Sequence, residues 1–166
     1  MSAIASTSLN NRNSLLHSSV IGGLIIGTLH LIIQVGIVFS FLGKTPLMNA
    51  LQYIASGAMG NAAFTGGLAT ALLGVVLELL MTIIIAGVFM ASVDRIPILR
   101  RHVIVGSLLY GFGVFIVMNF IVLPLSAAPM LPVPPMWLLM EIILEHILLI
   151  GLLLGILVRR NSDAHK

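Results

Sequence analysis

The sequence contains no cysteine, and this absence excludes several kinds of site at once. Without a thiol there can be no disulfide framework, no zinc–thiolate site and no cysteine nucleophile. Phosphate-binding loops and nucleophile-elbow motifs are also missing. The absence of these motifs argues against an enzyme. Any chemistry must come from histidine, carboxylate and amide side chains.

Charged residues are also scarce. They make up 8% of the chain, hydrophobic residues make up 59%, and the mean hydropathy is +1.17. Soluble domains carry about 25% charged residues, because water must wet their surface. The basic residues cluster at the ends of apolar runs instead of forming the basic patch of a nucleic-acid-binding protein. The expected partner is therefore the lipid bilayer, and no nucleic-acid partner is expected.

Four apolar runs are long enough to cross a membrane, which takes about 20 helical residues. They cover Leu15–Leu42, Leu68–Val93, Val103–Pro124 and Trp137–Val158. We predict an all-α, polytopic membrane protein with a four-transmembrane-helix bundle. A polar N-terminal segment (1–14) precedes the transmembrane domain (15–158), and a basic C-terminal tail (159–166) follows it.

The distribution of basic residues predicts the orientation. One side of the predicted bundle carries seven of them, and the other side carries only Lys44. The seven are Arg12, Arg95, Arg100, Arg101, Arg159, Arg160 and Lys166. Because basic loops stay in the cytoplasm, both termini are expected to be cytoplasmic. A chain this short is also expected to form a homo-oligomer or to join a larger membrane complex if it encloses a pathway.

The two outer connections differ. Pro46–Ser56 predicts a short amphipathic interfacial helix, capped by Thr45 and stopped by Gly57. The small residues of Gly57–Gly67 suit either a surface loop or a shallow re-entrant turn. The second outer loop, Leu125–Met136, should be extended, because proline is frequent in and beside it. These prolines are Pro124, Pro129, Pro132, Pro134 and Pro135.

Seven polar residues interrupt the apolar runs and form the candidate intramembrane site. They are His30, Gln34, Glu78, Asn119, Glu141, Glu145 and His146. Counted along antiparallel helices, most of them share one layer in the outer half of the membrane, with Glu141 nearer the surface. Small residues share a helical stripe with His30 and with Glu78, so both side chains should face neighbouring helices. Adjacent Glu145 and His146 are expected to point in different directions. The histidines near helix ends, His17, His102 and His165, should be solvated.

Three interpretations of this layer stay open. The side chains can tie helices together in a non-enzymatic accessory protein or small bundle, or they can carry protons or ions in a transporter or channel component. In the third interpretation the protein is a redox subunit that holds haem or quinone. We expect no cofactor and no metal, with haem ligation by His30 and His146 as the alternative.

Two pairs of glycines follow the small-xxx-small pattern, Gly23/Gly27 and Gly151/Gly155. This pattern predicts close helix packing within the chain, with homodimerisation as the alternative. Because both pairs lie in the inner half of the membrane, we expect the first and last spans to cross there.

Three segments in the middle of the chain resemble a known group of proteins. The segments are LQYIASG (51–57), NAAFTGG (61–67) and MNFIVLPLSAAP (118–129). They resemble uncharacterised small four-helix bacterial inner-membrane proteins, to which the inner-membrane protein YagU is a distant relative. The resemblance implies four helices in a bacterial plasma membrane and supplies no activity or ligand. Such proteins often carry histidine where this chain has Glu78, so no role is carried over to that residue.

Overall fold

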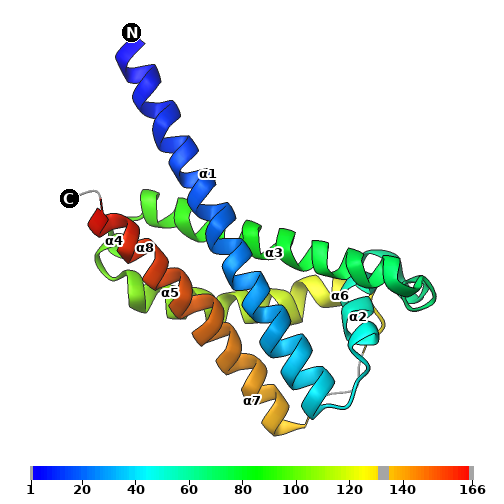
Figure 1. Cartoon of the computed structure of the whole chain (residues 1–166). Helices are drawn as coiled ribbons and strands as arrows, with labels where there is room; N and C mark the ends of the chain where they lie inside the picture. Colours follow the sequence, from blue (N-terminus) through cyan, green and yellow to red (C-terminus); the bar gives the residue numbers. More distant parts are fainter. Residues whose placement is uncertain (1, 131–134, 165–166) are drawn as a thin grey trace.

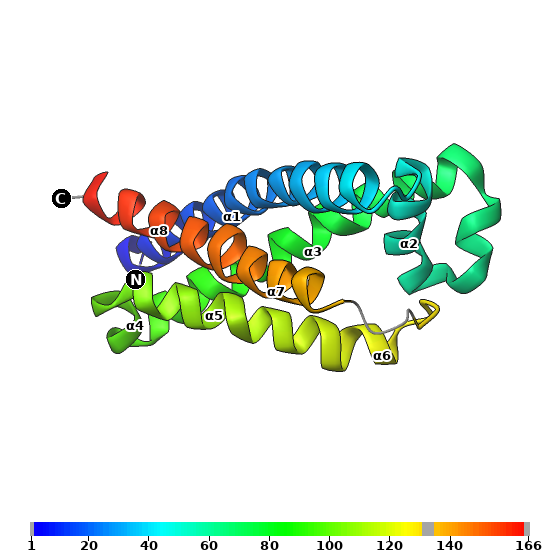
Figure 2. The same cartoon turned by 90° about the horizontal axis from the view of Figure 1, so that it is seen from below.

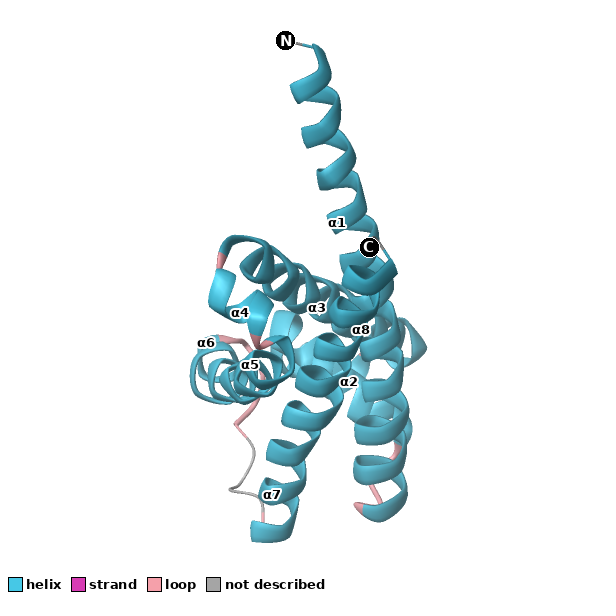
Figure 3. Cartoon of the chain, turned by 90° about the vertical axis from the view of Figure 1, so that its left-hand side faces the viewer, coloured by secondary structure: helices cyan, strands magenta, loops and turns pink. Residues whose placement is uncertain are grey.

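The computed structural model describes residues 2–130 and 135–164, and the side chains of 16–130 and 135–160. These residues form helices and connecting loops with no strand (Figure 3). The predicted all-α fold is therefore confirmed. Pro132, Pro134, His165 and Lys166 lie outside the described residues.

Four candidate membrane spans are present, Leu16–Leu42, Gly67–Arg95, Val103–Leu125 and Met136–Arg160. They match the predicted spans to within about three residues at each end, which is ordinary uncertainty for helix ends. Only 17–33% of the apolar window in each span is buried inside the protein. Leu109 and Phe120 expose 68% and 70% of their surface, which suits a lipid environment and not water. The chain is a multi-pass membrane protein.

Most spans change helix type along their length. The first joins α1 (Ser2–His30) to a π-helix, η1 (Leu31–Leu42), and the second is α3 (Gly67–Arg95). The third joins α5 (Val103–Val117), the π-helix η3 (Met118–Val122) and α6 (Leu123–Leu125). The fourth joins α7 (Met136–Glu145), the π-helix η4 (His146–Leu152) and α8 (Leu153–Ala164). The short α4 (Pro97–Arg101) connects α3 to α5.

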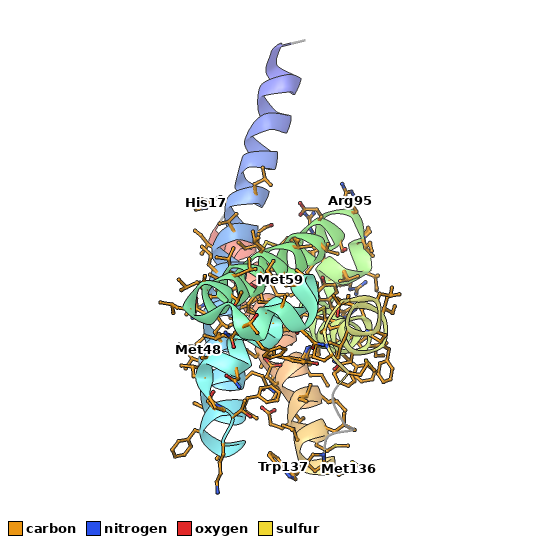
Figure 4. All side chains as sticks on the ribbon, turned by 90° about the vertical axis from the view of Figure 1, so that its right-hand side faces the viewer. His17, Met48, Met59, Arg95, Met136 and Trp137 are labelled. Atoms are coloured by element: carbon orange, nitrogen blue, oxygen red, sulfur yellow. The ribbon has the colours of Figure 1, made fainter. Side chains whose placement is uncertain are left out.

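The spans pack mainly as two pairs, α1 with α3 and α5 with η4. In Figure 1, α1 runs obliquely across α3, and the α7–α8 span runs obliquely across α5. Figure 2 shows both chain ends and α4 towards one end of the bundle, with α2 and α6 towards the other. Figure 4 labels His17 and Arg95 at one end and Met136 and Trp137 at the opposite end. The basic α4 turn and the two termini therefore share one end.

Glycines allow the close approach within each pair. A side chain at Gly23 would meet the backbone of Ile83 in α3, and one at Gly27 would meet Thr82. A Cβ at Gly151 would lie 2.5 Å from the carbonyl oxygen of Ser107 in α5. The prediction of close intrachain packing is confirmed. The first and last spans do contact each other, but the two glycine pairs do not form that contact. Each glycine pair contacts a different neighbour, because small-residue spacing identifies a contact face without identifying its partner.

The largest buried apolar cluster lies on the side of Glu78 and Glu145 that faces the α4 end of the bundle. It combines residues from all four spans, and Phe89 and Leu154 in it are fully buried. Its members are Ile26, Ala86, Phe89, Met90, Val93, Val114, Ile150 and Leu154. We call it the apolar core. Tyr110 Oη adds a hydrogen bond of 2.8 Å to the Ile85 carbonyl oxygen, which ties α5 to α3.

The predicted short helix is present as α2 (Leu47–Met59), followed by a 3₁₀-helix, η2 (Gly60–Thr65). Pro46 and not Thr45 occupies the N-cap, and no side chain caps it. The helix passes through Gly57 and ends before Gly60, whose φ of +61° favours glycine. The helix therefore starts one residue after the predicted start and ends three residues after the predicted end. The segment Gly57–Gly67 is mostly helical, since it comprises the end of α2 and the 3₁₀-helix η2.

The polar face of α2 is its buried face. Gln52 Nε2 donates to the Gly67 carbonyl oxygen at 3.0 Å and contacts Thr70 Oγ1 at 3.2 Å, while Leu47 and Met48 are exposed. Tyr53 Oη donates to the Pro129 carbonyl oxygen at 3.4 Å. These bonds attach α2 to α3 and to the second outer loop, and they leave the apolar side of α2 facing outwards.

Candidate functional site

His30, Glu78, Glu145 and His146 come together from three different spans. His30 ends α1, Glu78 lies in the middle of α3, Glu145 ends α7, and His146 begins η4. We call these four residues the polar cluster. The sequence places these four residues at one depth in the membrane. We expected them to meet, because inserting an isolated ionisable group into a membrane costs about 2.5–3.5 kcal/mol of free energy.

His30 is the central member of the polar cluster. Its Nδ1 lies 2.9 Å from Glu78 Oε1, and its Nε2 lies 3.8 Å from Glu145 Oε1. The His30 side chain is 16% exposed, so both contacts are shielded from solvent. Since both ring nitrogens face carboxylates, the arrangement stabilises the protonated imidazole. The prediction that Glu78 faces His30 is confirmed.

His146 is held by its own span. Its Nδ1 lies 2.8 Å from the Ile142 carbonyl oxygen and 2.9 Å from Glu145 Oε2. Both neighbours are hydrogen-bond acceptors, so Nδ1 must carry the hydrogen. The expectation that adjacent Glu145 and His146 point in different directions is compatible with this contact, because Glu145 also reaches His30 while the His146 ring packs against Phe115.

Hydrogen bonding within the cluster is incomplete. His30 Nδ1 and both oxygens of Glu145 lie close to partners, yet none of them makes a well-aligned hydrogen bond. The residue Glu145 is only 7% exposed. A buried polar atom without a well-formed bond costs about 1–3 kcal/mol. Such atoms are uncommon in folded proteins and call for a functional explanation.

Two further predicted residues lie outwards of the cluster, one helical turn along the first and fourth spans. Gln34 in η1 is 4% exposed, and its amide interacts with the carboxylate of Glu141 in α7. Gln34 Oε1 and Glu141 Oε2 are buried without a hydrogen-bond partner. We call Gln34 and Glu141 the outer polar pair. Glu141 is also within electrostatic range of His30, Glu145 and His146.

Asn119 does not join the polar cluster through any hydrogen bond that the described residues form. Its Nδ2 donates to the Phe115 carbonyl oxygen, 2.9 Å away on its own helix. Phe115 itself was not a predicted site residue, yet its ring packs edge-on against His146 with the centroids 5.7 Å apart. Nothing in the sequence distinguishes Phe115 from the other six phenylalanines. His17 and His102 are exposed near the ends of spans, as expected.

Three π-helical segments accompany the polar residues. Gln34 lies in η1, Asn119 lies in η3, and His146 begins η4. π-helical turns are rare and are found frequently at functional sites, where they shift side chains out of the ordinary helical register. Their coincidence with the polar layer supports a role for this region beyond packing.

The geometry of the two histidines bears on the metal and haem alternatives. Among the described residues, no three histidine, aspartate or glutamate side chains are grouped to hold a metal ion. The His30 and His146 rings lie 6.4 Å apart, but both nitrogens of His30 face carboxylates instead of a shared axis. Comparison with protein-family models, curated proteins and solved structures found no match for this chain.

Proposed function

We propose that this multi-pass membrane protein binds and relays protons through the polar cluster, as a component of a proton-coupled transporter or channel. The observation that supports the proposal best is the sequence of contacts Glu78–His30–Glu145–His146. Carboxylate and imidazole alternate along it, so each proton acceptor has a neighbour to which it can pass a proton. Imidazole suits this role because it accepts a proton on one nitrogen and releases one from the other.

The two sides of the cluster differ, and this asymmetry supports access from one side. The apolar core lies between the cluster and the end that carries α4. The outer polar pair lies on the opposite side. Protons would therefore enter past Glu141 and meet the apolar core as the barrier, which must open, or be bypassed in an oligomer, for complete transfer.

The proposal includes a location and an orientation. We place the protein in a bacterial inner membrane with both termini in the cytoplasm, supported by the basic residues at the end that the termini share. The outer polar pair then faces the periplasm.

Proton flux into liposomes tests the proposal. Purified full-length protein is reconstituted with an internal pH-sensitive dye, and a potassium diffusion potential drives protons inwards. We expect acidification with the original chain and with Asp94→Asn, an exposed carboxylate at the other end of the protein. Glu78→Gln should abolish it, because an amide keeps the shape and cannot take up a proton. Acidification no faster than in empty liposomes would contradict the proposal.

A structural role is the second candidate, and one observation favours it. Through His30 and Glu145 the polar cluster links the first span to the fourth, in addition to the apolar core that all four spans share. In that case the protein is a non-enzymatic accessory subunit held together by the cluster. Glu78→Gln should then leave the unfolding temperature nearly unchanged, and no liposome sample should acidify.

A further inference from the structure

The ionisable groups of the site do not balance in charge. Three carboxylates, those of Glu78, Glu141 and Glu145, outnumber the two imidazoles of His30 and His146. From α5, Phe115 packs against His146 and carries no charge. When all three carboxylates are ionised, one negative charge is unmatched even with both imidazoles protonated. Unmatched charge is costly in a low-dielectric interior, so the site favours uptake of one positive charge.

The oxygens that could accept this charge lie at the outer polar pair. Gln34 Oε1 and Glu141 Oε2 are both buried and have no hydrogen-bond partner, although the two side chains interact. The residue Gln34 is 96% buried, as its 4% exposure indicates. A buried amide oxygen beside a carboxylate is an acceptor without a donor. Carboxylate and carbonyl oxygens are the ligands that hard cations prefer.

We propose that Gln34 and Glu141 bind an alkali-metal cation at the outer end of the polar cluster. A monovalent ion matches the single unmatched charge, whereas a divalent ion would leave an excess of positive charge. The ion would gain oxygen ligands from η1 and α7 and would hold the first and fourth spans together. This site goes beyond the proposed function, because Gln34 and Glu141 are not members of the polar cluster that relays the proton.

Thermal unfolding of the full chain in an uncharged detergent tests the cation site. Choline chloride is replaced stepwise by sodium or potassium chloride at constant ionic strength and constant pH. We expect a saturable rise in the unfolding midpoint, of about 5 °C or more when the cation reaches about 100 times its Kd. Either alkali cation supports the proposal, and the larger rise identifies the preferred ion. Equal midpoints in choline, sodium and potassium salts would overturn it.

Matched variants locate the effect. Glu141→Gln keeps the size of the side chain and removes its charge, so the cation-dependent rise should disappear, and Gln34→Leu should weaken it. Asp94→Asn makes the same charge change at the other end of the protein and should keep the full rise. A full rise in Glu141→Gln would overturn the assignment even if Gln34→Leu fails to fold. Proton flux without any cation effect would defeat this site alone, and a cation effect without flux would defeat the proton relay alone.

Discussion

His30 Nδ1 lies 2.9 Å from Glu78 Oε1, and this contact joins the end of α1 to the middle of α3. The Glu78 side chain is 14% exposed, so the pair is shielded from water. Removing one member of a shielded pair leaves its partner buried without a counter-charge, which lowers stability. An exposed pair contributes little to the free energy of unfolding. Among the described residues, Asp94 and Arg100 form an exposed pair, which allows a comparison with the shielded His30–Glu78 pair.

We predict that Glu78→Leu lowers the free energy of unfolding by about 1–3 kcal/mol, because His30 loses its nearer partner. The matched control is Asp94→Leu, since Asp94 pairs with Arg100 at 3.7 Å in an exposed position. Its loss should stay below about 1 kcal/mol. Thermal unfolding in detergent measures both variants. Equal losses would mean that burial of the His30–Glu78 pair has no energetic consequence.

Two glycines of α5 predict opposite results on substitution. A Cβ at Gly111 would collide with the His146 carbonyl oxygen and the Gly151 backbone, while a Cβ at Gly113 meets nothing within 4 Å. Gly111→Ala should therefore lower the unfolding midpoint by several degrees. Gly113→Ala should leave it unchanged or raise it, because alanine is the better helix former by about 1 kcal/mol. A neutral Gly111→Ala would show that α5 and η4 pack less closely than described.

The orientation predicts the results of reporter fusions. A reporter after Lys166 or within Asp94–His102 should read as cytoplasmic, and one within Leu125–Met136 should read as external. The reason is that arginine is retained on the cytoplasmic side and is absent from the second outer loop. Alkaline phosphatase and fluorescent-protein fusions give complementary signals for the two locations. An active phosphatase after Lys166 would reverse the orientation and the direction of proton entry.

Tyr53 lies outside the membrane spans, and its burial predicts that the stability of the protein depends on pH. Burial raises the pKa of the Tyr53 hydroxyl above its usual value of 10. Because the folded state then holds its proton more tightly than the unfolded state, stability should fall as the pH rises from about 10 towards the folded pKa. In Tyr110→Phe, Tyr53 is the sole tyrosine, so tyrosinate absorbance reports its ionisation directly. An ionisation midpoint of Tyr53 at or below pH 10 in the folded protein would contradict the burial of its hydroxyl beside Pro129.

The sequence by itself determined the four spans and the layer of polar residues. Span length and hydropathy are local properties, and depth follows from counting residues along helices that must cross the same bilayer. The stripe that Gly27 shares with His30 likewise identified a buried face before any partner was known. The resemblance to bacterial inner-membrane proteins and the three-part division of the chain are still predictions.

Only the tertiary structure decided which faces meet. It placed Gly23 against α3 and Gly151 against α5, turned Asn119 back onto its own helix, and brought Glu145 into contact with His146. The physical reason is that a stripe of small residues can pack against any of several neighbouring helices, because their local sequence patterns are nearly the same. The choice among them depends on how all four helices fill space together, and the π-helical turns shift side chains by amounts that the regular helical period does not contain.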